Sequence, residues 1–398
     1  MKILIVSYFY RPDVRPGSFR ATALVEALRE LAPAETQIDV ITTHPRRAGS
    51  AGIDAPLLER QPGLSIFRIA LPERQIGMAN QAIAFGVFAR NALLNASPRY
   101  DLVFATSGRL MTAVLGAWLA RRTGARLYLD IRDIFVEGIA ELLPRGAGSV
   151  AQWLSSALER WTVGYAAKVN LVSAGFADYF TQRYPKHSFS FITHGVDAEF
   201  VAAAATMPAA LPMHAGDGVA HVVYAGNVGE GQGLHHIIPG LAARMGSRLR
   251  FTVVGDGNSK HALEAAIAAA GAGNVTLVPP MMREALLEVY RSADVLFVHL
   301  NDFAAFRKVL PSKLFECAAL GKPLWAGVAG YPAQFIRAEI PNAAVFAPCD
   351  VDAAVRCFAD LKLEPSPRPE FLRKYDRVAL SCELARDILS VAQQGSDD

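Results

Sequence analysis

Short apolar runs alternate with helix-like segments along most of the 398-residue chain. The runs are rich in Val, Ile, Leu and Phe and are bounded by turn residues, as expected for buried strands. Strands that alternate with helices at this spacing predict an α/β fold with doubly wound parallel sheets. The expected strands are 2–7, 38–42, 64–69, 102–105, 126–130, 169–172, 189–192, 221–225, 250–254, 275–278, 295–299 and 324–326.

The alternation is interrupted once, at 194–218, where prolines and glycines flank a run of alanines. The chain is also long enough for two domains of common size. We therefore expect a domain at 1–193, a linker or hinge at 194–218, a second domain at 219–370, and a C-terminal segment at 371–398 that ends in a helix. Two such domains in tandem predict a cleft between them, with ligands bound beyond the carboxyl ends of the strands.

The net charge of +3 gives no reason to expect nucleic acid as a partner, so any anion site must be local. The four cysteines lie in the last quarter without CxxC or zinc-like spacing, which predicts reduced thiols and a cytoplasmic protein. The first apolar run is too short for a signal peptide. No uncharged stretch is long enough to span a membrane.

Residues 306–324 combine a helix signal with an unusual placement of charge. Pro311 and Ser312 suit a first helical turn, and Arg307, Lys308 and Lys313 gather at that positive end, where a cation is unfavourable. An anion bound to the free backbone N–H groups would explain the cations. The alternative is a solvated basic loop in which Lys313 pairs with Glu316 on the surface.

Two other segments that follow strands are candidates for binding an anion or a ligand. Gly17 and Ser18 open a helix after the first strand, where they can contact an anion, unless Ser18 is an ordinary N-cap. Residues 224–233 contain four glycines, which predicts close approach of a ligand or simply a flexible loop.

Gly255-Asp256-Gly257 does not complete a dinucleotide fingerprint, because position 260 is lysine. The absence of a fitting acidic residue at the next strand end also disfavours an NAD oxidoreductase. The segment is therefore expected to be a tight strand-to-helix turn.

Residues 130–137 place three carboxylates beside Arg132 at a strand end, which favours either a functional loop or an ion pair that fixes it. The histidines show no metal spacing, and we expect the adjacent His235 and His236 to point to different faces of a helix. No metal and no other cofactor is expected.

The apolar segment 78–96 is predicted to be either a core helix of the first domain or part of an apolar and basic surface patch that contacts anionic lipid. In the second reading the basic residues of the patch are Arg46, Arg47, Arg60, Arg68, Arg74, Arg90 and Arg99.

Taken together, these motifs resemble the GT-B glycosyltransferases, in particular the retaining family 4 group that assembles bacterial surface polysaccharides. The resemblance covers essentially the whole chain. Its motifs are Pro16-Gly17-Ser18, Arg132-Asp133, Ile192-Thr193-His194-Gly195-Val196-Asp197, Tyr224-Ala225-Gly226-Asn227 with Gln232-Gly233, Val254-Gly255-Asp256-Gly257, Asn274-Val275-Thr276-Leu277, Pro311-Ser312-Lys313-Leu314-Phe315-Glu316 and Gly321-Lys322-Pro323.

The sequence departs from the family pattern in its charges. The E-x7-E motif keeps Glu316, but its first glutamate is replaced by Lys308. The arginine and lysine that neutralise the donor diphosphate are replaced by Asn227 and Gln232. We infer that neutralisation has moved to Lys308 and Lys313, which is similar to a P-S-K-x-F-E subgroup acting on lipid-linked acceptors.

The resemblance implies two tandem Rossmann-like domains, with the acceptor on the first, the donor on the second, and a last helix that returns to the first. It implies a metal-independent, retaining hexosyl or N-acetylaminosugar transferase. The donor would be a nucleotide sugar, with a UDP-sugar expected, and the acceptor a saccharide or polyprenyl-diphosphate-linked precursor. Such a protein would be cytoplasmic or peripheral on the inner face of the plasma membrane. The implied site residues are Asp133, Lys308 and Glu316 for catalysis, Gly17, Ser18, Gly226, Asn227, Gly255, Asp256, Pro280, Lys308, Ser312, Lys313 and Glu316 for the donor, and Arg15, Arg132 and Glu137 for the acceptor.

Two alternatives remain open besides the oxidoreductase. A sugar-nucleotide 2-epimerase or hydrolase has the same fold and would convert the donor without an acceptor. A non-enzymatic two-domain binding protein of the periplasmic kind would need an export signal, which we do not expect.

Overall fold

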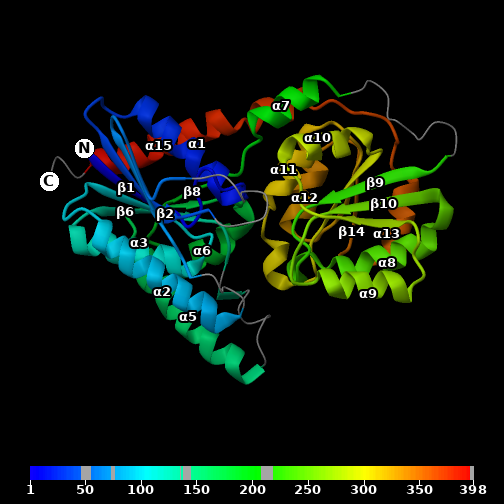
Figure 1. The fold of residues 1–398 in the computed structure, drawn as a ribbon, viewed down its shortest axis with the longest axis horizontal. Coiled ribbons are helices and arrows are strands. Elements are labelled where there is room, and N and C mark those ends of the chain that lie inside the picture. Colours follow the sequence, from blue (N-terminus) through cyan, green and yellow to red (C-terminus); the bar gives the residue numbers. More distant parts are fainter. Residues whose placement is uncertain (46–54, 73–76, 135, 138–144, 208–217, 395–398) are drawn as a thin grey trace. The chain divides into compact units, whose positions relative to one another are not determined.

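The structure of the protein is a computed structural model that describes residues 1–45, 55–72, 77–134, 136–137, 145–207 and 218–394. The chain forms two compact units (Figure 1). Unit 1 contains Met1–His194 together with Arg377–Asp398, and unit 2 contains Gly195–Asp376.

Unit 1 is built on an eight-stranded sheet with the order β3-β4-β2-β1-β5-β6-β7-β8. All neighbouring strands are parallel except β3 and β4, which form a hairpin. The strands are β1 (Lys2–Val6), β2 (Gln37–Thr43), β3 (Leu58–Gln61), β4 (Leu64–Ile69), β5 (Leu102–Thr106), β6 (Arg126–Ile131), β7 (Lys168–Leu171) and β8 (Phe189–Ser190).

Helices cover both faces of this sheet. Helices α1 and α15 pack together on one face, and α2, α3 and α5 lie on the other (Figure 1). Leu384 and Ile388 of α15 are buried against Leu24 and Leu28 of α1, so the last helix completes the core of unit 1. The helices are α1 (Pro16–Leu31), α2 (Met78–Asn95), α3 (Leu110–Thr123), α5 (Arg145–Tyr165), η1 (Ala174–Phe176), α6 (Ala177–Arg183) and α15 (Arg377–Gln393).

Unit 2 is built on a six-stranded, wholly parallel sheet with the order β11-β10-β9-β12-β13-β14. Its strands are β9 (Ala220–Ala225), β10 (Leu249–Val254), β11 (Val275–Val278), β12 (Val295–His299), β13 (Leu324–Gly327) and β14 (Ala343–Phe346). Its helices are α7 (Ala198–Ala205), η3 (Glu230–Gln232), α8 (Leu234–Met245), η4 (Gly246–Arg248), α9 (Lys260–Ala269), α10 (Arg283–Ser292), η5 (Ala304–Arg307), α11 (Ser312–Ala319), α12 (Tyr331–Glu339), α13 (Val351–Ala359) and α14 (Pro369–Lys374).

Several parts of the fold differ from the sequence-based expectation, among them the additional short helix α14 before the last helix. The segment expected to be a linker contains α7, whose Phe200 is fully buried in unit 2. Strand β3 was not expected, because its sequence Leu-Glu-Arg-Gln is polar and only the turn at Gly63 marks the hairpin. The pair α12 and β14 was also missed. Both are short, and Ala-rich β14 lacks the Val and Ile content of the other strands.

Candidate functional site

Two glycine-rich loops pack against each other where β9 and β10 end. Gly255 has a φ of 152°, and a Cβ atom on it would lie 1.9 Å from the carbonyl oxygen of Gly226. The N–H of Val228 donates to the carbonyl oxygen of Asp256 at 2.9 Å. The contact between the loops therefore requires glycine at position 255, independently of any ligand.

Helix α11 begins at the same edge of the sheet, since it follows β12. Pro311 is its N-cap residue, the Pro311 side chain makes no capping hydrogen bond, and the first turn contains no acidic residue. The backbone N–H groups of that turn carry partial positive charge, which favours an anion there.

Lys313 and Glu316 form an ion pair on this helix, with 2.6 Å between Nζ and Oε2. The glutamate side chain is only 9% exposed and the lysine side chain 27%. The pair considered in the sequence analysis is thus present, but its carboxylate is buried, which is unlike a solvated surface pair.

Arg283 is a second cation close to Glu316 that the sequence analysis did not identify. Its Nη2 atom lies 2.8 Å from Asp197 Oδ2 and 4.0 Å from Glu316 Oε1, and its Nη1 atom lies 2.8 Å from Glu199 Oε2. Burial opposes its charge, but Asp197, Glu316 and Glu199 together raise its pKa. Glu316 is therefore held between Lys313 and Arg283.

The segment between β12 and α11 contacts the β9 loop. A Cβ atom on Gly231 would lie 2.9 Å from the ring of Phe306, and Nδ1 of His299 donates to the carbonyl oxygen of Gln232 at 2.7 Å. Burial lowers the pKa of His299 to about 4, so its ring is neutral. Lys308 is half-buried at the end of η5, next in sequence to Arg307, which donates to Asp302 at 3.0 Å.

The remaining predicted donor residues of unit 2 lie in the same set of loops. Asn227 and Gln232, the two positions without the expected cations, are joined by a hydrogen bond of 2.8 Å from Nδ2 to Oε1. Asp256 is exposed and accepts from the N–H of Gly257 at 2.9 Å. Pro280 is exposed in the loop after β11. Unit 2 thus brings all its predicted donor residues to the carboxyl ends of its strands.

The prediction that His235 and His236 point to different faces is wrong. Their ring centroids are 3.9 Å apart, and their Nε2 atoms lie 3.7 and 3.9 Å from the carboxylate oxygens of Glu230. Gly233, with a φ of 57°, turns η3 back over the start of α8 and brings Glu230 to the histidines. Ligand atoms of the three residues lie within 4.8 Å of one another, an arrangement that could hold a metal ion.

In unit 1, Gly17 and Ser18 lie in the first turn of α1. The helix begins at Pro16 with Arg15 as its N-cap residue, so the interpretation of Ser18 as the N-cap is wrong. The Ser18 hydroxyl is buried and has no hydrogen-bond partner among the described residues. A Cβ atom on Gly17 would lie 2.8 Å from a guanidinium nitrogen of Arg132, which places Arg132 directly against this turn.

Asp130, at the end of β6, is fully buried and forms a bidentate ion pair with Arg20. The two hydrogen bonds from Nε and Nη2 of Arg20 measure 2.9 and 2.8 Å. Arg20 also donates to the carbonyl oxygens of Ile192 and Thr193, and Asn170 donates to Asp130 at 2.8 Å. This network fixes the ends of α1, β6 and β7, and it was missed because nothing in the local sequence of Arg20 points to Asp130.

Arg132 and Asp133 follow β6, and burial is the largest influence on the pKa of each. Burial raises the pKa of Asp133 to about 6, although Arg132 acts to lower it. Burial also lowers the pKa of Arg132, against the attraction of Asp130 and Asp133. The pKa of the buried His194 is lowered well below its usual value by burial and by Arg132, Arg20 and Arg377. Unit 1 therefore offers a partly desolvated carboxylate that interacts with Arg132, and a neutral imidazole whose pKa Arg132 also lowers.

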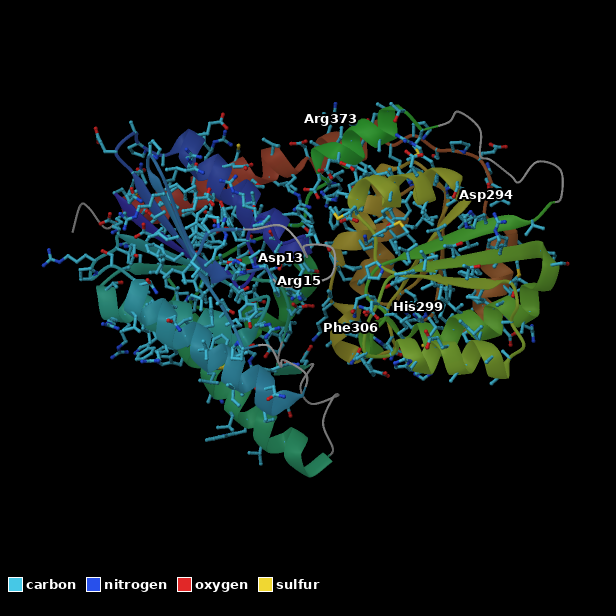
Figure 2. The ribbon with its side chains drawn as sticks, in the orientation of Figure 1. Asp13, Arg15, Asp294, His299, Phe306 and Arg373 are labelled. Atoms are coloured by element: carbon cyan, nitrogen blue, oxygen red, sulfur yellow. The ribbon has the colours of Figure 1, made fainter. Side chains whose placement is uncertain are left out.

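The other predicted residues of unit 1 are more scattered. The guanidinium of Arg15 lies 4.2 Å from the ring centroid of Phe9 and 3.9 Å from Asp13, and Arg15 and Asp13 belong to the loop that follows β1 (Figure 2). Glu137 is half-buried in the short described segment 136–137.

The basic patch expected around helix 78–96 is not supported in full. Arg68 is buried and bonded to Glu59 at 2.8 Å, so it is no surface residue. Arg60, Arg90 and Arg99 are exposed. Arg46, Arg47 and Arg74 lie outside the described residues.

Lys322 of the Gly-Lys-Pro motif is structural in unit 2. It is 2% exposed and donates to the carbonyl oxygen of Arg291 at 3.0 Å. Burial lowers its pKa to about 8. Arg368 donates to the carbonyl oxygens of Ala318 and Lys322, which fixes the C-terminal end of α11.

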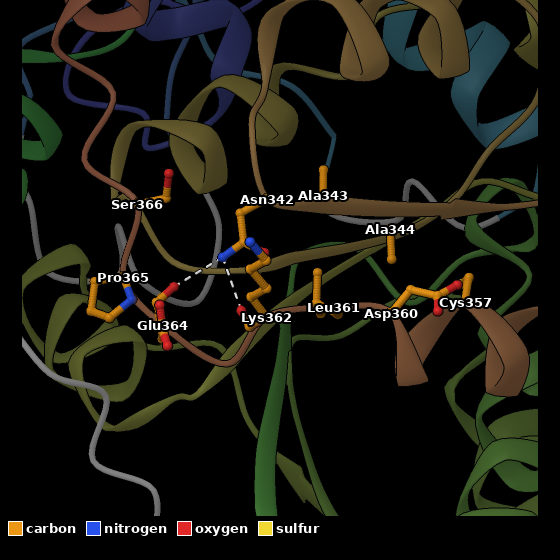
Figure 3. A pocket seen from close by; sticks show the side chains of 10 residues that line it. All are labelled: Asn342, Ala343, Ala344, Cys357, Asp360, Leu361, Lys362, Glu364, Pro365 and Ser366. Atoms are coloured by element: carbon orange, nitrogen blue, oxygen red, sulfur yellow. Dashed lines mark hydrogen bonds between the residues drawn. The ribbon is translucent and has the colours of Figure 1, made fainter.

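A pocket of about 580 Å³ lies away from these residues, at the amino-terminal end of β14 (Figure 3). Ligands of doubly wound sheets bind at the carboxyl ends of the strands, so this pocket is not the expected donor site. Its lining consists of Asn342, Ala343, Ala344, Cys357, Asp360, Leu361, Lys362, Glu364, Pro365 and Ser366.

Comparisons with known proteins agree with this arrangement. Residues 20–188 match the model of the glycosyl transferase 4-like domain, and residues 215–378 match that of the glycosyl transferases group 1. The chain is 26% identical over 342 residues to the putative colanic acid biosynthesis glycosyl transferase WcaI of Escherichia coli K12, covering 81% of this chain and 82% of that protein.

Two solved structures show the same fold. The α,α-trehalose 6-phosphate synthase of Burkholderia multivorans has a TM-score of 0.67 and 14% identity, covering 99% of this chain and 97% of that chain. Anabaena HepE in complex with UDP-glucose has a TM-score of 0.66 and 15% identity, covering 98% of this chain and 100% of that chain. The predicted α/β class with two doubly wound Rossmann-like domains is confirmed.

Proposed function

Because the chain belongs to the group 1 glycosyltransferases of family 4, which have the GT-B fold, we propose that it transfers a sugar from a nucleoside-diphosphate sugar to a saccharide hydroxyl. The observation that carries this proposal is the uncapped start of α11, with Lys313 and the buried Glu316 in its first turns. In the reaction the bond from C1 of the sugar to the diphosphate breaks, a bond from C1 to the acceptor oxygen forms, and the nucleoside diphosphate leaves with the proton of the acceptor hydroxyl.

The donor diphosphate would lie at the start of α11. As the bond to C1 breaks, negative charge grows on the departing diphosphate and must be stabilised. Lys308, Lys313 and the N–H groups of Ser312 and Lys313 would do this, in place of the cations missing at Asn227 and Gln232. Glu316 would accept hydrogen bonds from the ribose hydroxyls, and its ion pair with Lys313 orients the buried carboxylate.

Unit 1 would supply the residues that meet the reacting sugar and the acceptor. Gly17 and Ser18 would offer the first turn of α1 to a phosphate group, together with the buried Ser18 hydroxyl, which has no hydrogen-bond partner among the described residues. Asp133 would accept a hydrogen bond from the acceptor hydroxyl and orient its oxygen. Since the pKa of Asp133 is about 6, the carboxylate is charged near neutral pH. Arg132, Arg15 and Glu137 would contact the acceptor.

Three finer features belong to the same proposal. The donor is a UDP-sugar, in keeping with the UDP-glucose complex of HepE. The acceptor is a lipid-linked precursor of a surface polysaccharide, in keeping with the colanic acid role in the name of WcaI. The reaction retains the anomeric configuration. It needs no metal, because lysines and a helix terminus can supply the positive charge that stabilises the departing diphosphate.

One assay tests these features together. The purified protein is incubated with a panel of UDP-sugars and a short alkyl-diphosphate-linked sugar, with and without EDTA, and the product is analysed by NMR. We expect a disaccharide with the donor's anomeric configuration and an unchanged rate in EDTA. Lys308→Ala should lower the rate about 10- to 100-fold, the usual value of a charge-assisted hydrogen bond.

Each part of the proposal has a contradicting result. An inverted product would refute retention. Loss of activity in EDTA that zinc restores would refute metal independence and point to Glu230, His235 and His236. Release of UDP with an epimerised sugar in the absence of acceptor would favour a 2-epimerase.

A further inference from the structure

On helix α5 a group of polar side chains faces the protein beside the buried Val163, and four large apolar side chains face solvent. Its inward face carries Ser155, Ser156, Glu159 and Thr162, all buried. Its outward face carries Val150, Trp153, Leu154 and Trp161, which are 61, 65, 50 and 38% exposed. These four residues are spaced three, four and seven apart, so they lie along one side of the helix.

The inward face is fixed by a polar network. Oε1 of Glu159 accepts hydrogen bonds from the hydroxyls of Tyr179 and Tyr184 at 3.0 and 2.8 Å. Arg183 donates to the Ser156 hydroxyl at 2.6 Å and lies 3.6 Å from Glu159. A rotation that turned the tryptophans inward would break this network and expose unpaired polar groups to apolar surroundings, which is costly.

The neighbouring helices continue the apolar side. Helices α2, α3 and α5 lie side by side on one face of the unit 1 sheet (Figure 1). We call their exposed apolar residues the outer helix surface: Ile83, Leu94, Met111, Trp118, Val150, Trp153, Leu154 and Trp161. The chain has four tryptophans, and the fourth, Trp325, is fully buried in unit 2. An exposed apolar surface of this kind indicates a binding partner.

The exposed charged side chains described on these three helices are all positive. Helices α2 and α3 contain no acidic residue, and the single one of α5, Glu159, is buried. Arg90, Arg121, Arg122 and Arg160 are exposed on these helices. The partner that fits is therefore both apolar and anionic. Tryptophan beside arginine is the composition of a helix that lies in the boundary of a membrane with anionic headgroups.

We propose that the outer helix surface binds the surface of a bilayer that contains anionic lipid, with Trp118, Trp153 and Trp161 at the level of the headgroups. None of the described helices has both the length and the apolar content to cross the bilayer, so the contact is peripheral. This site differs from the patch expected from the sequence, because its centre is α3 and α5 and it does not include Arg68. The inference is independent of the proposed reaction, since lipid binding is measured without donor or acceptor.

Tryptophan fluorescence and co-sedimentation of the full chain test this inference. The vesicles are phosphatidylcholine alone or an equimolar mixture with phosphatidylglycerol, at low and high salt. We expect the mixed vesicles to shift the emission of the wild type to the blue and to sediment it, and high salt to weaken both effects.

Two sets of variants separate the apolar and charged contributions. Trp153→Ser and Trp161→Ser should each weaken binding about tenfold, because each removes a large apolar side chain from the membrane boundary. Arg121→Gln with Arg122→Gln should clearly weaken the preference for phosphatidylglycerol, because two of the four exposed arginines are removed. Val378→Ser, which removes an apolar side chain that is 60% exposed on α15, should bind like the wild type. Circular dichroism checks that each variant is folded.

The proposal is overturned if the wild type does not bind the mixed vesicles at low salt, or if the tryptophan variants bind as well as Val378→Ser. A blue shift that grows with protein concentration in the absence of vesicles, together with a dimer in sedimentation velocity, would also overturn it and assign the surface to a second copy of the chain.

Discussion

Replacing Asp133 by asparagine should stabilise the protein more at pH 8 than at pH 5. Burial raises the pKa of this carboxyl from 3.8 to about 6 in the folded protein. A folded-state pKa above the unfolded value means that ionisation disfavours folding. The protonated Asp133 carboxyl therefore contributes to the stability of the folded state below about pH 4, and this contribution is lost as the pH rises through about 6.

The size of the effect follows from the shift. The rise in the pKa of Asp133 from 3.8 to about 6 means that the ionised carboxylate lowers the free energy of unfolding by about 3 kcal/mol, once the group is ionised in both the folded and the unfolded state. About 1.4 kcal/mol of this loss of wild-type stability occurs between pH 5 and pH 8. The stability of Asp133→Asn relative to the wild type should therefore grow by about 1.4 kcal/mol over this range. For a domain of the size of unit 1 this is roughly 3–5 °C in Tm.

The assay is thermal unfolding followed by circular dichroism at pH 5 and pH 8, together with the transfer rate. Asp178→Asn, which removes an exposed carboxylate of unit 1, is the control. We expect Asp133→Asn to be more stable but much less active, as for a group whose desolvation serves catalysis. A stability difference that does not grow with pH would refute the desolvation of Asp133. Full activity in the variant would refute its role at the acceptor.

Two further substitutions test the framework of the site. Gly255→Ala should destabilise unit 2 by about 2–4 kcal/mol in urea unfolding, because the methyl group would clash with the carbonyl of Gly226; Gly273→Ala, with open space at its Cβ position, should have a small effect. Arg20→Met should destabilise unit 1 by about 3–5 kcal/mol, because it leaves Asp130 buried without its ionic partner; a change below about 1 kcal/mol would contradict the observed network.

The sequence predicts the parts of the site that follow buried strands. The loops after β9, β10 and β12 could be located because strand periodicity and glycine-rich turns are local signals. Lys313 and Glu316 could be paired from their spacing on one helix. The resemblance of short motifs then indicated the family, which the comparisons confirm.

Contacts between distant segments could not be predicted from local signals. Arg20 and Asp130 are 110 residues apart, and Arg283 reaches Asp197 across 86 residues. The spacing of His235 and His236 on a helix predicted that they point to different faces. This prediction failed because the turn at Gly233 brings Glu230, which lies outside α8, close to both rings. Periodicity also shows that α5 is amphipathic without showing which side faces the core.

The central claim, that the start of α11 binds a nucleoside diphosphate, is tested most directly by titrating UDP into the protein in a calorimeter. The account predicts binding by the wild type and by Lys362→Ala, which removes an exposed lysine elsewhere in unit 2. Lys313→Ala and Glu316→Gln should each weaken binding about tenfold or more, with the fold retained. Wild-type affinity in both of these variants would contradict the account.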